Sequence, residues 1–261
     1  MVGRVGEGRD FSALIGTVAR ELLAEVDVQQ TLQRAVELAA VHLAAGHLVG
    51  EVYASVALVR GRRQVENEAS SDERATRADQ LQYELGQGPC LDAIWERETF
   101  QIDDFTTEAR YPQWSRRVAR DTGIRSSLSF QLFTSGDSLG ALNLYCPYPH
   151  GFDAEDRAEG LMFAAHAAVA LASAQTEEQL RSAIASRTVL GQAQGILMER
   201  YKISPEKSFE VLRRVSQDGN VKVRDVAHQL PGILRCHSYV PSGRPRDPHW
   251  HRDDVRPSAS R

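Results

Sequence analysis

The sequence of 261 residues is long enough for two domains, and its 42% apolar and 25% charged residues exclude a wholly disordered chain. Residues 1–180 hold 16 basic and 27 acidic side chains, whereas residues 181–261 hold 15 and 8, so we expect any polyanionic partner to bind the carboxyl-terminal third. The longest nearly apolar run, Leu161 to Ala174, is shorter than the ~20 residues of a membrane span, and no secretory leader is evident, which predicts a cytoplasmic protein without a membrane partner.

Helical periodicity comes first in the chain. Apolar residues recur at helical spacing from Phe11 to Leu43, with a break near Asp27, which predicts two helices or one bent helix. We assign residues 1–27 to an amino-terminal helical segment and residues 28–174 to a first domain.

The first domain is predicted to hold an antiparallel sheet interleaved with helices. Strand-like runs, rich in β-branched residues or alternating in polarity, occupy residues 52–59, 64–69, 99–104, 126–133 and 138–145. Gly61 and the pair Gly136–Asp137 are expected to turn two hairpins. Helices are predicted around Leu81–Glu98, and from Pro112 to a stop at Gly123. The fold class is therefore α+β.

A very long helix is predicted next. Residues 154–201 contain no proline and favour one helix, or two joined near Gln175. One helix of this length spans about 70 Å. Because a small domain cannot bury so much helix, we expect a homodimer in contact along it.

Two short helices follow the long one. Ser204 and Pro205 are typical of a helix start, and Gly219 is expected to end that helix. Asn220 is expected to cap a last helix that stops at Pro231. Together with the end of the long helix they make a three-helix domain, residues 175–232, and residues 233–261 are predicted to be a disordered tail.

Residue types that carry chemistry elsewhere have structural interpretations here. His166 lies on an Ala-rich helix and is expected to be a satisfied helix histidine, rather than a haem ligand or phospho-acceptor. Asp103 and Asp104 are adjacent on a strand, point to opposite faces and cannot easily converge on one substrate. The cysteines have no metal-ligand spacing and are expected to be reduced and structural: Cys90, Cys146 and Cys236. We therefore predict no enzyme activity, cofactor or metal.

Two parts of the chain resemble known families. Residues 78–93, residues 102–132 and the run that begins at Leu139 and ends near Ala172 resemble the GAF domains of actinobacterial regulators. Residues 191–227, "GQAQGILMERYKISPEKSFEVLRRVSQDGNVKVRDVA", resemble an ANTAR domain, the three-helix RNA-binding module of transcription antiterminators. The matching positions of the ANTAR pattern are Ala193, Gly195, Leu197, Met198, Phe209, Leu212, Arg213, Ser216, Asn220 and Ala227.

The resemblance implies a signal-responsive antiterminator. An ANTAR dimer would grip paired RNA stem-loops in a nascent transcript, and the GAF domain would sense a small molecule or a protein, with no phospho-aspartate switch. The sequence departs from the ANTAR pattern at Gln194, where lysine is usual, and at Ser208, where alanine is usual. The first departure removes a cation from the expected RNA face.

The expected RNA contacts lie on the three short helical segments. Clustered cations suit phosphates, while Arg213 and Asn220 can also hydrogen-bond or stack on loop bases. The structural alternatives are a helix cap for Asn220 and, for Arg213, a surface ion pair with Glu210 or with a neighbouring residue. The predicted RNA-binding residues are Arg200, Lys202, Arg213, Arg214, Asn220, Lys222 and Arg224.

Two other functions remain open. The segment from Ser204 to Leu230 loosely resembles a helix-turn-helix, which would make the protein a DNA-binding transcriptional regulator. Alternatively, a GAF sensor or adaptor dimer could have lost RNA binding.

Two glycines, Gly191 and Gly195, lie four residues apart within the long helix. Each costs about 1 kcal/mol relative to alanine in an exposed helix interior. We expect them to form a flat strip that the two short helices or a second chain approaches closely. Gly195→Leu is accordingly expected to disrupt the three-helix fold.

Overall fold

The computed structural model describes residues 11–25, 27–44, 51–60, 64–96, 98–134 and 138–236, without the side chains of residues 11–14, 44 and 231–236. The chain divides into two compact units, Met1–Glu178 and Gln179–Arg261. Helix α6 (Ala154–Tyr201) contributes residues to both. No helix among the described residues is long and apolar enough to cross a membrane.

The first unit is built on the predicted antiparallel sheet. Its strand order is β2-β1-β5-β4-β3, and every neighbouring pair is antiparallel. The predicted turn residues Gly61, Gly136 and Asp137 lie outside the described residues. The α+β prediction is confirmed, and the strands are β1 (Tyr53–Arg60), β2 (Gln64–Ser70), β3 (Phe100–Ile102), β4 (Ser126–Phe133) and β5 (Ser138–Cys146).

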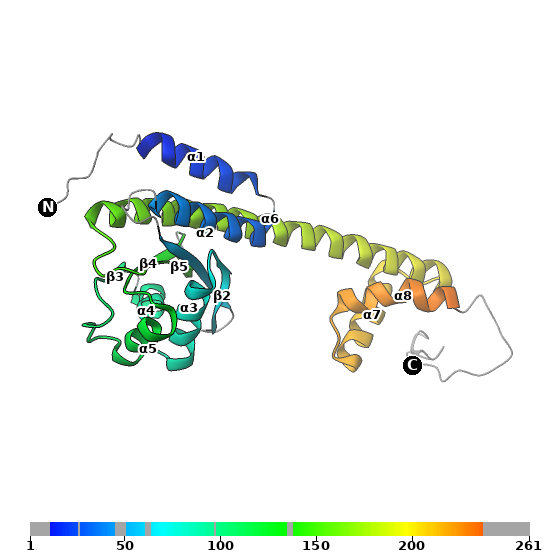
Figure 1. The fold of residues 1–261 in the computed structure, drawn as a ribbon. Helices are drawn as coiled ribbons and strands as arrows, with labels where there is room; N and C mark the ends of the chain where they lie inside the picture. Colours follow the sequence, from blue (N-terminus) through cyan, green and yellow to red (C-terminus); the bar gives the residue numbers. More distant parts are fainter. Residues whose placement is uncertain are drawn as a thin grey trace. The chain divides into compact units, whose positions relative to one another are not determined.

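Helices α2 (Val28–Ala44) and α6 cover one face of the sheet, and α1 (Phe11–Ala24) packs on α2 (Figure 1). The two predicted amino-terminal helices are thus separate. Asp27 causes the break, since its carboxylate accepts hydrogen bonds from the backbone N–H groups of Gln29 and Gln30, at 2.8 and 3.1 Å. The core on this side combines Leu and Val side chains of the sheet with the alanine-rich first half of α6.

Three helices cover the opposite face: α3 (Glu73–Leu85), α4 (Pro89–Glu96) and α5 (Pro112–Thr122) (Figure 1). The sequence predicts helical structure only from Leu81, but α3 begins at Glu73, where Asp72 caps it by accepting a hydrogen bond from Arg74 N–H. Gly86 adopts left-handed φ and ends α3, so α3 and α4 are separate helices. With helices on both sides, nearly every residue of β4 is buried, including its serines.

The second unit is a three-helix bundle. The long helix α6 is continuous through Gln175, as the first of the two predictions had it, and α7 (Pro205–Gly219) and α8 (Val223–Cys236) follow. Ser204 caps α7 as predicted, with its hydroxyl accepting a hydrogen bond from Lys207 N–H. The buried core comprises Ala193, Leu197, Leu212, Val226, Ala227 and Leu230.

Two predictions about helix ends were wrong. Asn220 does not cap α8: it adopts left-handed φ, 48°, at the end of α7, a conformation that asparagine tolerates better than most residues. Helix α8 does not stop at Pro231 but continues to Cys236, into the predicted tail. An internal proline removes one backbone hydrogen bond, which bends a helix more readily than it ends one. The rest of the predicted tail lies outside the described residues.

The expectation for the glycine strip was wrong for the two short helices. Apart from the surrounding turns of α6 itself, a Cβ atom added to Gly191 or Gly195 would have no heavy atom of the described residues within 4 Å. Instead, Gly195 lies on an open hollow of about 770 Å³ whose other lining residues, among those described, are on α6: Gln192, Ile196, Glu199 and Arg200. The described side chains of α7 and α8 do not approach the glycines, so they give Gly195→Leu no steric reason to disrupt the bundle.

Candidate nucleic-acid interface and sensor pocket

The seven residues predicted to bind RNA all lie in the second unit, and all but the half-buried Arg224 are exposed. Arg200 is on α6, Arg213 and Arg214 are on α7, and Arg224 is on α8. Lys202, Asn220 and Lys222 lie in the connections between these helices. The bundle thus presents them from every one of its elements.

Ion pairs divide the predicted cations into two sets. Lys202 Nζ lies 2.6 Å from Glu199, Arg214 Nε lies 3.8 Å from Asp218, and Arg224 Nε lies 3.4 Å from Asp225. The other set, Arg200, Arg213 and Lys222, has no ion pair within the part of the chain that the structure describes. We call these three residues the unpaired cations. They can bind phosphates without first breaking an ion pair to a carboxylate.

The alternative interpretation of Arg213 as the partner of Glu210 is not what the structure shows. Glu210 pairs instead with Lys207, at 3.0 Å. Helix α7 therefore holds three cations, of which Lys207 and Arg214 have acidic partners and Arg213 has none among the described residues. The guanidinium of Arg213 keeps its hydrogen-bond donors available.

The connection from α7 to α8 is held by hydrogen bonds. The backbone N–H of Asn220 donates to Ser216 and Gln217 carbonyls. The Ser216 hydroxyl donates to the Val221 carbonyl at 2.5 Å, and Val221 N–H donates back to the Ser216 carbonyl at 3.0 Å. Because the backbone carries this turn, the exposed Asn220 side chain is not needed as a cap for α8.

Gln194 and Ser208, the two departures from the ANTAR pattern, contact each other. Gln194 Nε2 donates to the Pro205 carbonyl at 3.2 Å and to Ser208 Oγ at 3.4 Å. The buried Ser208 hydroxyl donates to the same carbonyl at 2.7 Å. Position 194 thus faces the start of α7, and the expectation that Gln194 merely removes a cation from an RNA face is replaced by a structural role: it fastens α6 to α7.

This contact predicts coupled effects of substitution. Gln194→Ala should lower the stability of the bundle by about 1 kcal/mol, the usual net value of an intramolecular hydrogen bond. The same change in a Ser208→Ala background should cost less, because one acceptor is already gone. Amide hydrogen exchange at Leu212 and Ala227 measures both values, with Gln192→Ala as the exposed control on the same helix. Equal costs in the two backgrounds would rule out the coupling.

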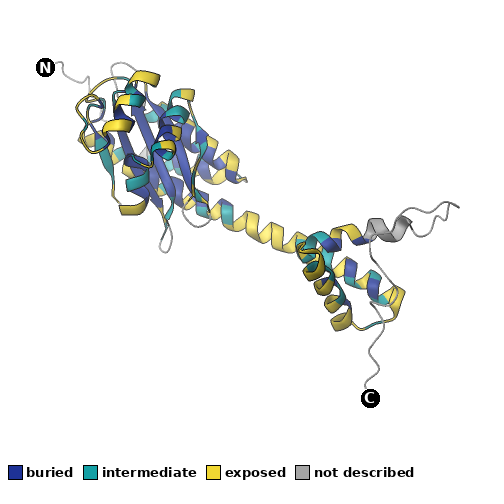
Figure 2. Cartoon of the chain, turned by 90° about the horizontal axis from the view of Figure 1, so that it is seen from below, coloured by how far each residue is buried: buried dark blue, intermediate teal, exposed yellow. Residues whose placement is uncertain are grey.

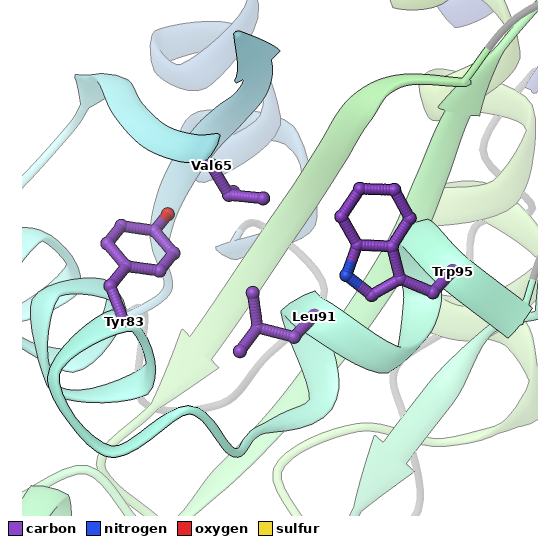
Figure 3. A pocket seen from close by; sticks show the side chains of 4 residues that line it. All are labelled: Val65, Tyr83, Leu91 and Trp95. Atoms are coloured by element: carbon purple, nitrogen blue, oxygen red, sulfur yellow. The ribbon is translucent and has the colours of Figure 1, made fainter. Parts of the chain in front are cut away.

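A pocket of about 490 Å³ opens between α3, α4 and β2 in the first unit. Tyr83 of α3 and Trp95 of α4 lie across the space from each other, while Val65 and Leu91 lie between them (Figure 3). Among the described residues, none of the lining side chains carries a charge at neutral pH. A pocket with this lining suits an uncharged, largely apolar molecule with an aromatic portion.

A buried polar network lies near this pocket and centres on Asp79, which is fully buried. Its carboxylate accepts hydrogen bonds from Tyr145 Oη at 2.5 Å, Asn67 Nδ2 at 2.6 Å and Asn143 Nδ2 at 3.2 Å. Burial raises the pKa of Asp79, and these hydrogen bonds oppose the rise. Gln82 links the network to the first turn of α4, since its Nε2 donates to Tyr145 Oη and its Oε1 accepts from Cys90 N–H.

Several polar atoms in this region have no partner among the described residues, although they are buried. They are Tyr83 Oη, Ser127 Oγ, Ser129 Oγ and Asn143 Oδ1. Reasoning from the sequence selected none of the pocket residues. The sequence did hold one sign of the buried polar side chains: serine alternates with Leu128 and Phe130 on β4, which places a row of polar side chains on the face that α4 covers.

The remaining candidates behave as structural residues. The thiol of Cys90 is fully buried, which raises its pKa, and Cys146 is likewise buried and free. His166 Nδ1 lies 2.8 Å from the Met162 carbonyl one turn earlier, as expected of a satisfied helix histidine. Asp104 pairs with Arg125 at 2.9 Å. The Cys236 side chain lies outside the description, and no cluster of metal ligands occurs among the described residues.

Comparisons with known proteins match a different family to each of the two units. The GAF domain family model matches residues 25–172, and the ANTAR domain model matches residues 178–230. A GAF domain of a phosphoenolpyruvate-protein phosphotransferase from Coxiella burnetii has 15% identity and a TM-score of 0.52, over 67% of this chain and 99% of that one. Free methionine-R-sulfoxide reductase from Neisseria meningitidis has 14% identity and a TM-score of 0.50, over 67% and 96%. At such identities the likeness shows the fold alone. No curated protein sequence matches significantly.

Proposed function

Because the chain belongs to the GAF family and carries an ANTAR domain after it, we propose that it is a signal-responsive transcription antiterminator. In this proposal the carboxyl-terminal bundle binds paired RNA stem-loops in nascent transcripts, in the cytoplasm, and the GAF domain controls that binding. Both matched families, GAF and ANTAR, are sensor and regulatory modules.

The observation that carries the RNA proposal is the set of unpaired cations, which lies in the segment that matches the ANTAR domain model. Arg200, Arg213 and Lys222 come from α6, α7 and the connection before α8, and each is exposed. A surface of this kind favours a phosphate backbone over a flat apolar partner. The acidic composition of the rest of the chain leaves this unit as the place for a polyanion.

A DNA-binding regulator is the second candidate, and one structural feature favours it. Helices α7 and α8 are joined by three residues, Asn220 to Lys222, the connection length of a helix-turn-helix. The ANTAR match favours RNA, and an adaptor that has lost RNA binding is the third candidate.

A binding comparison with the intact protein separates the three. We expect tighter binding to a two-hairpin RNA than to duplex DNA of the same length, with an affinity that falls as salt rises. Equal affinity for arbitrary duplex DNA contradicts the proposal, and binding to neither supports the adaptor. Sequencing of transcripts recovered with the protein then identifies the natural targets.

The sensor half of the proposal rests on the pocket between Tyr83 and Trp95. Its aromatic and apolar lining supports a small, uncharged molecule as the signal, in place of a phosphorylated aspartate. The buried network around Asp79 lies beneath the same helices, so a ligand that shifts α3 or α4 also disturbs it.

We also propose that a second copy of the chain packs along α6. Residues 176–185 are exposed on all sides of the helix, as Figure 2 shows in yellow. Two large apolar side chains in this stretch, Leu180 and Ile184, are 59% and 65% exposed. The glycine strip lies on the same side of the helix, closer to the bundle, because Leu180, Ile184, Gly191 and Gly195 follow one another at intervals of four or seven residues.

The dimer proposal reverses the expected effect of Gly195→Leu. The variant should keep its helix content, because a Cβ there meets no other described element within 4 Å, but it should dissociate about tenfold more readily because it overpacks the strip. Sedimentation equilibrium measures the dimer, and circular dichroism the fold. Ser182→Leu places the same side chain on the other side of α6 and serves as the control. A Gly195→Leu dimer as stable as the original would refute packing at the strip.

A further inference from the structure

Phe209 is an aromatic side chain that the bundle does not bury. It lies on α7 and is 43% exposed, whereas Leu212 and Ser208 of the same helix are fully buried. Phe209 is not among the side chains that form or pack against the core of the bundle. Its ring therefore offers an exposed aromatic surface to a partner.

The surroundings of Phe209 are cationic. Arg213 follows it by four residues, so both side chains lie on the same side of α7. Arg213 is the cation of α7 without an acidic partner among the described residues, since Lys207 and Arg214 pair with Glu210 and Asp218.

We propose that Phe209 and Arg213 form a stacking platform for an unpaired base of the RNA loop. This inference rests on the proposed RNA function and names residues that would contact bases rather than phosphates. An unstacked base can lie on an aromatic ring or on a planar guanidinium, and a neighbouring phosphate can bind the same arginine. Bases inside a duplex are already stacked on each other, so the platform suits a loop.

Protein contact is the rival use of an exposed phenylalanine. Arg213 argues against it, because an apolar partner surface would have to cover a guanidinium that has no acidic partner within the described chain. A negatively charged partner with flat, unpaired bases satisfies both side chains together.

The test uses the intact protein and a two-hairpin RNA enriched from a pool with randomised hexaloops. Phe209→Leu keeps an apolar side chain and helix propensity but removes the ring, and Phe209→Trp keeps an aromatic face. We expect the leucine variant to bind about 5- to 100-fold more weakly, the range for loss of one stacked base, and the tryptophan variant to bind within about threefold of the original. Phe133→Leu, the same change at an exposed phenylalanine of the sheet domain, should leave affinity unchanged.

A spectroscopic signature separates stacking from a structural effect. With 2-aminopurine placed at each loop position in turn, one position should lose fluorescence on binding the original protein and not on binding Phe209→Leu. Equal affinity and equal quenching with Phe209→Leu overturn the platform while the RNA function stands. If Phe209→Leu alters sedimentation or circular dichroism but still quenches 2-aminopurine fluorescence, Phe209 is a protein contact. That result also overturns the stacking platform. If the original protein binds no RNA from the pool, the proposed function itself fails.

Discussion

Replacing Arg200, Arg213 and Lys222 together with alanine should weaken RNA binding by the intact protein about a hundredfold at low salt. Each of the three is an exposed cation without an ion pair among the described residues, so each can contribute one phosphate contact. Loss of three contacts should also lower the slope of log Kd against log salt concentration by about 2 to 3. Filter binding across a salt series measures both quantities.

The matched control removes the same number of charges from the paired set. Lys202, Arg214 and Arg224 each lie beside a carboxylate, so a triple alanine variant there should lose less affinity and less of the salt slope. If both triple variants lose the same affinity, net charge rather than the position of the cations governs binding. If neither loses any, the adaptor interpretation gains the support that the RNA proposal loses.

Replacing Asp79 with alanine should destabilise the sheet domain by about 3 kcal/mol or more. The change removes the acceptor of Tyr145 Oη and one of the two acceptors of each of the Asn143 and Asn67 amide groups, which keep Ser55 and Ser70. Each buried donor left unsatisfied costs about 1–3 kcal/mol. Thermal unfolding followed by near-ultraviolet circular dichroism reports on this domain through the buried Trp114 and Tyr145. Asp121→Ala removes a surface carboxylate near Arg120 and should change stability little. A wild-type melting curve for Asp79→Ala would contradict the buried network.

The raised pKa of Asp79 also fixes the sign of a pH effect. The folded protein binds the proton of this carboxyl more tightly than the unfolded chain, in which its pKa is about 3.9. The stabilisation is therefore complete below about pH 4 and is lost as pH rises through the folded pKa. The quantity to measure is the unfolding free energy of the original protein minus that of Asp79→Asn, in which the contributions of the other carboxyl groups cancel. This difference should decline as pH rises above about 4. A difference that grows with pH would contradict the direction of the shift.

Local signals were enough for most of the fold. The β-branched runs and the alternation on β4 predicted the strands. The proline-free stretch from Ala154 predicted one long helix or two joined near Gln175, and the structure has one. Asn220 and Pro231 misled because their interpretation depends on backbone conformation and on packing that residue type alone does not specify. The beginning of α3 was missed because Asp72 stands before a polar helix with weak apolar periodicity.

The candidate sites were predictable only in part. The charge difference between the two parts of the sequence indicated where a basic surface would lie. The division into paired and unpaired cations could not be predicted, because it depends on which carboxylate each side chain reaches: Glu210 pairs with Lys207 and not with Arg213. Phe209 was matched to the ANTAR pattern but not assigned a role, because an apolar residue in a helix is usually buried. The pocket could not be predicted because α3, α4 and β2 meet only in the folded domain.

The hydrogen bonds between Gln194 and Ser208 make these two positions a single unit of variation. A redesign that restores the family's usual lysine or alanine one position at a time passes through a protein in which one side chain has lost its partner. Consensus substitution, which assumes that positions contribute independently, should therefore mislead at this junction. Chimeras that exchange ANTAR segments need to take both positions from the same parent.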